Sequence, residues 1–240
     1  MSVSTSLGVR SAERARTRRR GRLRLLLVLV VLSASVAAGG WLVLWSSALG
    51  VSEVSVTGVA RLRPEQVSER AAIVAGTPLA RLDTTAVAAR LAMLPVVERV
   101  EVVRRWPRSV EIRVRERTPA AARPRGSSWV LVDRSGVSFA TQARRPAGLP
   151  AISAPVDAGP AALRAALDVL EVLPVRVRDQ VRQVRAADAE HVTMRLSRDR
   201  TVLWGSTERS RRKASVLAVL LTRKASVYDV SAPDIPTTRA

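Results

Sequence analysis

The 240-residue sequence has no cysteine and one histidine, His191. Without cysteine there can be no disulfide bonds, thiolate metal sites or cysteine nucleophiles. A single histidine excludes metal sites built from several histidines. The glycine-rich phosphate loops, the nucleophile-elbow pentapeptide and the paired-histidine helix motif are also absent. We therefore predict a protein that is not an enzyme and that holds no metal, cofactor or small-molecule substrate.

Lysine and acidic residues are scarce. All but two of the 40 basic residues are arginines, the exceptions being Lys213 and Lys224, and only 20 residues are acidic, which gives a formal net charge of +20. Apolar residues make up 47 % of the chain, enough for a packed core. We expect most arginines to lie on solvated faces, with a patch for anionic wall polymer, nucleic acid or acidic partners as the open alternative.

The N-terminal region combines a basic tail with a long uncharged run. Residues 1–24 hold eight arginines against one acid and show no hydrophobic period, as in disordered segments. Residues 25–45 contain no charge and, at about 1.5 Å per residue, match the roughly 30 Å hydrocarbon core of a bilayer. We predict a single transmembrane helix over residues 25–45. The anchor residues are Leu25, Leu29 and Leu32 within the span and Trp41 and Trp45 at its outer end.

The charges on either side of this span predict its orientation. The tail is strongly basic, whereas residues 46–65 carry balanced charge, so the positive-inside rule places the N-terminus in the cytoplasm and the rest outside. A cleaved signal peptide ending near Val36-Ala37-Ala38 is the alternative, although the apolar run continues well beyond that point. We expect the tail to interact with anionic lipid, with nucleic-acid binding as the alternative.

Residues 51–117 predict a small β-α-α-β-β domain. A strand ends at Gly58, a helix begins at Pro64, and a second helix is capped by Asp83 and ended by Pro95. Valines then alternate with charged residues over 100–104 and 110–115, on either side of Trp106-Pro107. This pattern indicates a hairpin with one apolar face and one arginine-rich, solvated face.

Residues 118–240 predict a mixed α/β domain. A hairpin turns at Asp133-Arg134-Ser135-Gly136, an alanine-rich helix ends at Pro174, and strands follow over 192–196 and 202–205. The turn between these strands, Arg198-Asp199-Arg200, lacks the glycine expected of a tight hairpin. A helix around residues 216–221 and a last strand over 227–230 complete the domain. The fold class is therefore α+β.

Several single residues have a structural interpretation. Asp133 reads as a turn residue and His191 as a surface or strand-end residue. We expect Trp106, Trp129 and Trp204 to be packing anchors, because they are spread over different elements and do not form a base-stacking platform.

Longer motifs resemble a known family. Val54-x-Val56-x-Gly58, Gly76-Thr77-Pro78-Leu79, Arg104-x-Trp106-Pro107 and Glu116-Arg117-x-Pro119-x-Ala121 resemble a POTRA domain of the type found in the bacterial cell-division family FtsQ/DivIB. Downstream, Leu131-Val132-Asp133-x-x-Gly136, Trp204-Gly205 and Tyr228-Asp229-Val230-Ser231-x-Pro233 resemble the β domain of the same family. The implied organisation is a tail (1–24), a transmembrane helix (25–45), a POTRA domain (51–117) and a β domain (118–240).

This resemblance implies a division scaffold at the septal inner membrane that binds other divisome proteins. In the family, the C-terminal edge of the β domain receives a strand of FtsB, which travels with FtsL. From the residues, we expect the strand over 227–230 to be an exposed edge, since no later strand is predicted. The implied contact residues are Val227, Tyr228, Asp229, Val230, Ser231, Pro233, Asp234 and Ile235. The alternative function is a membrane-anchored, arginine-rich module that binds anionic wall polymer or nucleic acid.

Overall fold

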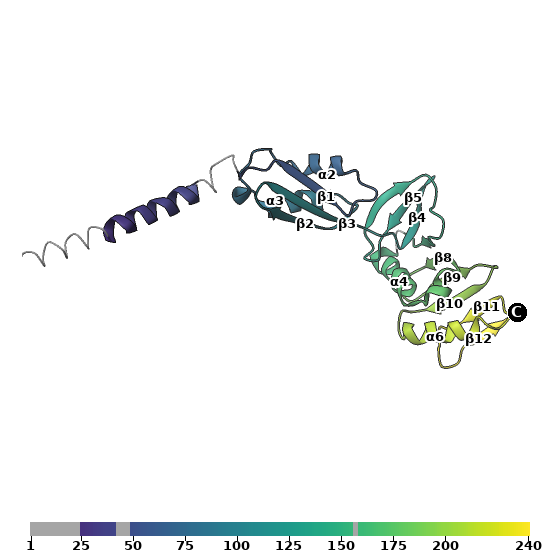
Figure 1. Cartoon of the computed structure of the whole chain (residues 1–240). Helices are drawn as coiled ribbons and strands as arrows, with labels where there is room; N and C mark the ends of the chain where they lie inside the picture. The colour runs from purple at the N-terminus through teal and green to yellow at the C-terminus, as the bar shows by residue number, and fades with distance from the viewer. Residues whose placement is uncertain (1–24, 42–48, 156–157) are drawn as a thin grey trace, which may run out of the picture. The chain divides into compact units, whose positions relative to one another are not determined.

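The computed structural model describes residues 25–41, 49–155 and 158–240. Residues 25–41 are helical (Figure 1). Leu25, Leu29, Leu32 and Trp41 are exposed on this helix. The predicted basic tail and Trp45 lie outside the described residues. Among the residues described, none of the helices is both long enough and apolar enough to cross a membrane.

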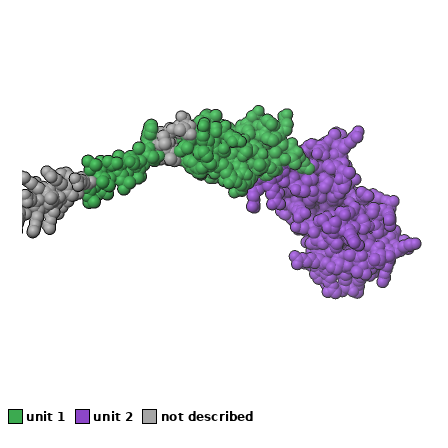
Figure 2. All heavy atoms as spheres, in the orientation of Figure 1, with its two compact units in different colours: residues 1–91, 100–114 green, residues 92–99, 115–240 purple. Residues whose placement is uncertain are grey.

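The chain divides into two compact units, which are coloured separately in Figure 2. The first comprises residues 1–91 and 100–114, and the second comprises residues 92–99 and 115–240.

The elements of the first unit follow the predicted β-α-α-β-β order, with one additional short turn of helix. In chain order they are β1 (Glu53–Thr57), α2 (Pro64–Ala71), η2 (Leu79–Arg81), α3 (Thr84–Ala92), β2 (Val97–Arg105) and β3 (Ser109–Glu116). The three strands form a sheet in the order β1-β3-β2, in which β1 runs parallel to β3. The predicted hairpin is therefore the pair β2–β3, and β1 joins it through β3.

Local sequence explains where both helices of this unit begin and end. Pro64 occupies the first turn of α2, where its missing N–H costs nothing, and Gln66 Oε1 accepts the N–H of the capping residue Arg63 at 3.0 Å. Ala72 ends α2 in a left-handed conformation (φ 50°). Asp83 caps α3 as predicted, because its Oδ1 accepts the N–H of Ala86 at 2.9 Å.

The core of the first unit is formed by the apolar stripes of the helices and one face of the sheet. Its fully buried members include Val67, Leu79, Leu91, Val110 and Ile112. Burying each such side chain contributes about 1.5–3 kcal/mol. The alternation that predicted the hairpin thus separates core residues from charged ones along β3.

The second unit is built on one large sheet. Its strands are β4 (Ala121–Arg125), β5 (Ser128–Val132), β6 (Ser138–Gln142), β7 (Ala151–Ser153), β8 (Val181–Ala186), β9 (Val192–Leu196), β10 (Thr201–Gly205), β11 (Val227–Asp229) and β12 (Thr237–Arg239). They lie in the order β12-β11-β10-β9-β8-β7-β4-β5-β6. The helices are α4 (Gly159–Val172), α5 (Val175–Arg178) and α6 (Ser210–Leu220).

Helices α4 and α6 supply one wall of the core of this unit. Leu167 and Leu170 of α4 and Leu217 of α6 belong to the same buried cluster as Trp204 of β10 and Tyr228 of β11. The predicted packing role of Trp204 is confirmed, since its side chain is fully buried.

The β9–β10 hairpin forms despite the missing glycine. Arg198 and Asp199 both adopt positive φ angles, 61° and 51°. Two consecutive positive φ values are what a two-residue hairpin loop of the primed type requires, and glycine or asparagine adopts them at lower cost. The turn therefore places ordinary L-residues in a disfavoured region.

The structure corrects the prediction that residues 227–230 form an exposed edge strand. β12 pairs antiparallel with β11, with Val227 opposite Arg239 and Asp229 opposite Thr237, so β11 lies between β10 and β12. The prediction was wrong because Thr237–Arg239 is three residues long, wholly exposed and without apolar alternation. Such a strand is held by its backbone ladder and leaves no period in the sequence.

Candidate functional site

The outer backbone edge of β12 is the strongest candidate binding feature of the second unit. The carbonyl of Arg239 faces β11, because it accepts the N–H of Ser226 at 2.9 Å and the Ser226 hydroxyl at 3.2 Å. Backbone groups alternate in direction along a strand, so the N–H and C=O of Thr238 point away from β11. Within the described residues β12 is the last strand on this side of the sheet. The edge can therefore accept a further strand.

The segment that leads into β12 is tied to helix α6. Asp234 accepts a hydrogen bond from Arg209 at 2.6 Å and forms an ion pair with Arg212 at 2.5 Å. The two arginines bind different carboxylate oxygens, so both oxygens are occupied. Together with the Ser226–Arg239 bonds, these contacts hold the three-residue strand at both ends.

Two of the residues predicted to contact a partner, Tyr228 and Val230, are buried in the unit. Tyr228 is fully buried, and its hydroxyl donates to the carbonyl of Arg223 at 2.8 Å. Val230 is also fully buried, and its N–H donates to the carbonyl of Leu203 at 3.0 Å. Both residues stabilise the sheet from within, so they cannot be the surface that a partner first meets.

The remaining predicted contact residues surround the β11–β12 connection. Asp229 Oδ1 accepts the N–H and the hydroxyl of Ser231 at 2.9 and 2.7 Å, which shapes the start of the connection. Pro233 is buried, whereas Ile235 is 76 % exposed. Val227 is half-buried on β11. Of the predicted set, Ile235 is the apolar side chain that remains available at the surface.

A buried lysine fixes the loop on which Arg209 sits. Lys213 of α6 donates to the carbonyls of Trp204 at 3.0 Å and of Ser206 at 2.9 Å. Burial of the ammonium group lowers the pKa of Lys213 from its ordinary value, and the charge of Arg209 lowers it further. Sequence patterning did not reveal this role, because Lys213 lies among arginines at the polar start of the helix.

The POTRA hairpin residues have mixed roles in the first unit. Arg104 donates to the carbonyl of Leu82 at 2.6 Å and so fastens β2 to the segment before α3. Trp106 is 54 % exposed next to Pro107 at the hairpin turn, so the prediction of a packing anchor there was wrong. A tight turn projects its central side chains away from the sheet, which leaves no core within reach.

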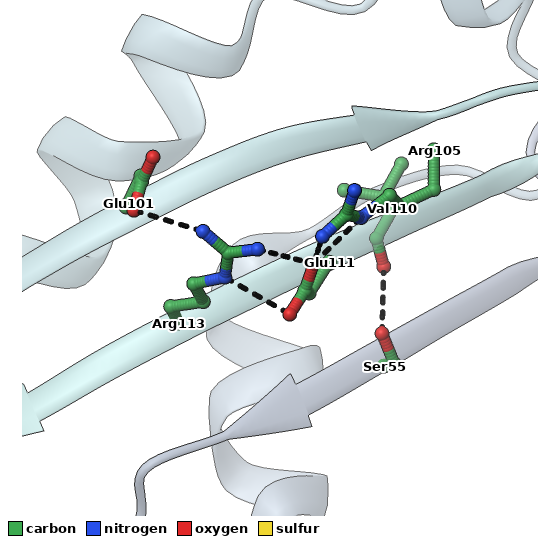
Figure 3. Close-up of polar contacts among 6 residues, drawn as sticks. All are labelled: Ser55, Glu101, Arg105, Val110, Glu111 and Arg113. Atoms are coloured by element: carbon green, nitrogen blue, oxygen red, sulfur yellow. Dashed lines mark hydrogen bonds and ion pairs between the residues drawn. The ribbon is translucent and has the colours of Figure 1, made fainter.

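The charged face of this hairpin is a connected ladder of ion pairs (Figure 3). Glu111 accepts hydrogen bonds from Arg113 at 2.9 Å and from Arg105 at 2.7 Å, and Arg113 also reaches Glu101 at 3.4 Å. The bonds from Arg113 and then Arg105 lower the pKa of Glu111. The predicted solvated face with opposite charges across the strands is confirmed, since Arg105, Arg113 and Arg115 are each paired with an acid.

A polar contact that sequence analysis missed lies within the second unit, between Arg117, directly after β3, and the first hairpin of that unit. Arg117 donates to Asp133 at 2.6 Å and to the carbonyl of Pro95 at 3.0 Å. Asp133 also accepts the N–H of Val137 at 2.9 Å and both the N–H and the hydroxyl of Ser135. Burial alone would raise the pKa of Asp133, but the bonds from Ser135, Arg117 and Val137 outweigh burial and lower it.

Asp133 is therefore the turn residue that the sequence predicted, with an additional ion pair. Neighbouring Glu116 is half-buried at the end of β3.

His191 is exposed, and its Nδ1 lies 2.9 Å from Asp188, consistent with the predicted surface role. Among the residues that the structure describes, no three histidine, cysteine or acidic side chains gather as metal ligands would.

Comparison with known proteins accounts for both units. Residues 49–117 match the family "POTRA domain, FtsQ-type" and residues 121–232 match "Cell division protein FtsQ/DivIB, C-terminal". The chain belongs to the FtsQ/DivIB family of cell-division proteins. The two matches follow one another along the chain in the order that the motifs predicted.

Individual FtsQ proteins are similar over most of the chain. The "Cell division protein FtsQ" of Streptomyces bingchenggensis is 39 % identical over 207 residues, which cover 82 % of this chain and 78 % of that protein. The FtsQ of Streptomyces griseus is 39 % identical over 206 residues, covering 81 % of this chain and 99 % of the relative. The FtsQ of Mycolicibacterium smegmatis is 38 % identical over 210 residues, and the chain spans 62 % of its length.

Proposed function

We propose that this protein is a division scaffold that recruits and couples other divisome proteins at the septum and performs no chemistry of its own. Membership of the FtsQ/DivIB family supports the division role. The observation that carries the proposal within the β domain is the outer edge of β12, which pairs with no further strand among the described residues and lies beside an exposed apolar side chain, Ile235. An extended segment of an FtsB-like protein, travelling with an FtsL-like protein, pairs with this edge.

The proposed docking mode moves the interface outward by one strand from the residues first expected. The partner's backbone bonds to the outward N–H and C=O of Thr238, while β11 pairs with the other side of β12. Tyr228 of β11 and Val230, directly after β11, are buried in the core beneath. Asp234 acts through its two arginine partners to position the strand. Ser231 and Pro233 shape the connection, and Ile235 is the side chain that meets the partner.

The rest of the chain serves to place this edge outside the cytoplasm. The uncharged run 25–45 anchors the protein in the cell membrane in a single pass, with the basic tail 1–24 inside. The POTRA domain, residues 51–117, contacts further division proteins, and the exposed Trp106 at its hairpin turn is the side chain best suited to such a contact. The β domain, residues 118–240, carries the docking edge.

A proline at Thr238 tests the docking edge. The N–H of Thr238 points away from β11, so Thr238→Pro removes a donor to the incoming strand and no bond to β11. Proline is tolerated at such edge positions. We expect the affinity for the FtsB-like partner to fall by at least about tenfold, which corresponds to about 1.4 kcal/mol. Thr238→Ala is the matched control, because it removes the same side chain and keeps the N–H.

The two variants are compared by equilibrium binding of the full chain to the FtsB-like protein, with thermal unfolding measured in parallel. Unchanged affinity in Thr238→Pro, at unchanged stability, would move the interface away from β12. Equal loss in Thr238→Pro and Thr238→Ala would show that the side chain, and not the backbone edge, makes the contact.

A further inference from the structure

The open face of the large sheet carries polar and basic side chains in cross-strand rows. One row consists of Ala151, Gln183, Arg195 and Thr201 on β7 to β10, and the next consists of Ser153, Arg185, Thr193 and Leu203. The alternating residues Ile152, Val184, Met194 and Val202 lie in the core with α4 and α6. The two rows therefore lie on the face that these helices do not cover.

A depression on this face gathers positive charge. It has a volume of about 330 Å³, and its lining includes Trp129, Arg145, Arg182, Arg195 and Asp199. The three arginines come from three different elements: the β6–β7 connection, β8 and β9. The single acid in the lining, Asp199, is at the β9–β10 turn, and its Oδ1 lies 3.6 Å from Arg195. The depression is thus positively charged despite one local ion pair.

One of these arginines is held in place before any ligand arrives. The guanidinium carbon of Arg145 lies 5.7 Å from the centre of the Trp129 ring. Its NH1 donates to the carbonyls of Leu149 and Arg182, each at 3.0 Å. Stacking and two backbone bonds fix the position of the charge without neutralising it. A preorganised cation loses little conformational entropy when an anion binds.

The chemistry of the surroundings selects the kind of anion. Protein interfaces depend on buried aromatic or aliphatic anchors. The aromatic side chain of this lining, Trp129, is already stacked with Arg145, and the two rows offer mainly hydroxyl, amide and guanidinium donors. A planar carboxylate pairs best with one guanidinium in its own plane. A tetrahedral phosphate can accept hydrogen bonds from several directions, which suits a depression lined by three arginines from different elements.

We propose that this depression binds phosphate groups of a linear, hydrophilic polyanion, such as a poly(glycerol phosphate) chain. The site is separate from the β12 edge and does not depend on partner docking. If the β domain lies outside the membrane, as proposed above, wall polymers of this class would be within its reach.

Charge reversal within the depression tests the site. The full chain is titrated with fluorescently labelled poly(glycerol phosphate), and binding is followed by anisotropy at low salt. In Arg182→Glu/Arg195→Glu the affinity should fall about tenfold or more, because two attractive contacts become repulsive. The matched control, Arg176→Glu/Arg211→Glu, makes the same change in net charge at exposed residues of α5 and α6, and its affinity should change less than about threefold.

A gain of affinity gives the second test. Asp199→Asn removes the one carboxylate of the depression, and asparagine suits the positive φ of 51° at this position. Binding should tighten about threefold, whereas Asp168→Asn, which alters the net charge equally on α4, should leave it unchanged.

Two results would overturn the proposal. Equal losses of affinity in the two double variants would show that binding depends on the net charge of the whole chain, including the basic tail, and not on the depression. Equal or tighter binding of poly-L-glutamate would assign the depression to acidic protein segments instead. The proposal would be supported if poly(glycerol phosphate) binds more tightly than poly-L-glutamate and this binding is lost only in Arg182→Glu/Arg195→Glu.

Discussion

Removal of the Asp133 carboxylate should destabilise the second unit more than any other single polar change that we describe. The carboxylate accepts four hydrogen bonds, two from backbone N–H groups, one from the Ser135 hydroxyl and one from Arg117. In Asp133→Ala the guanidinium and both N–H groups lose their acceptor at a site that is largely shielded from water. Each lost bond of this kind costs about 1–3 kcal/mol, and partial rehydration brings the expected total to about 3–5 kcal/mol.

Asp133→Asn distinguishes the contribution of the turn to stability from that of the ion pair. The amide oxygen can still accept the N–H groups of Ser135 and Val137, while the attraction to Arg117 is lost. We therefore expect a smaller cost, about 1–3 kcal/mol. Chemical denaturation followed by tryptophan fluorescence measures both variants, because Trp204 is fully buried in the same unit.

The wild-type chain should also show a specific dependence on pH. The pKa of Asp133 is lower in the folded chain than its ordinary value of 3.8. The carboxylate therefore contributes stability that is fully present above about pH 4 to 5 and is lost as the pH falls toward the folded pKa. Asp133→Asn should lack this contribution, so its deficit relative to wild type should shrink in acid. A deficit in Asp133→Ala below about 1 kcal/mol, or one that is equal at pH 7 and pH 3, would refute the reasoning.

Three further changes have defined outcomes. Tyr228→Phe removes the 2.8 Å hydrogen bond to the carbonyl of Arg223 and should lower the free energy of unfolding by about 1 kcal/mol in chemical denaturation; no change would mean that water replaces the bond. Arg198→Gly relieves the positive φ of 61° and should raise stability by about 0.5–1 kcal/mol, and a loss would show that the arginine side chain supports the turn. Leu29→Arg should reduce membrane retention, since an arginine costs about 2.5–3.5 kcal/mol at the centre of a span and part of that at Leu29, between the inner end and the centre; unchanged fractionation would argue against residues 25–45 as the anchor.

The POTRA hairpin was predictable because its physical cause is periodic. Valines and isoleucine alternate with charged residues along β3, and the structure buries Val110, Ile112 and Val114 while it exposes Arg113 and Arg115. The cap of α3 was predictable for a similar reason, since aspartate accepts a backbone N–H at a helix start. In each case the interaction lies within a few residues along the chain.

Features that depend on distant segments left no such pattern. β12 consists of two threonines and an arginine and is defined by its bonds to β11. The Arg117–Asp133 pair joins residues 16 positions apart, and nothing in either sequence context indicates the other. The same holds for the depression on the open face, where Arg145 meets Arg182 across 37 positions.

The error about the exposed edge has the same origin. Tyr228 and Val230 lie on the last strand that the sequence predicted, which was expected to be the exposed edge, and the family resemblance implied that this edge contacts a partner. Because the short polar strand β12 pairs with β11, both residues lie in the core and not at the surface. The edge of this sheet is therefore set by β12, the strand that shows no apolar alternation in the sequence.

Depletion of the protein in its own cells, with complementation by three versions of the full chain, tests the central claim most directly. The wild-type chain and Thr238→Ala should restore division, whereas Thr238→Pro, at equal abundance and stability, should leave cells that elongate without dividing. Restoration of division by Thr238→Pro to the level of Thr238→Ala would contradict strand docking at β12. Normal division without any version would contradict the proposed scaffold role itself.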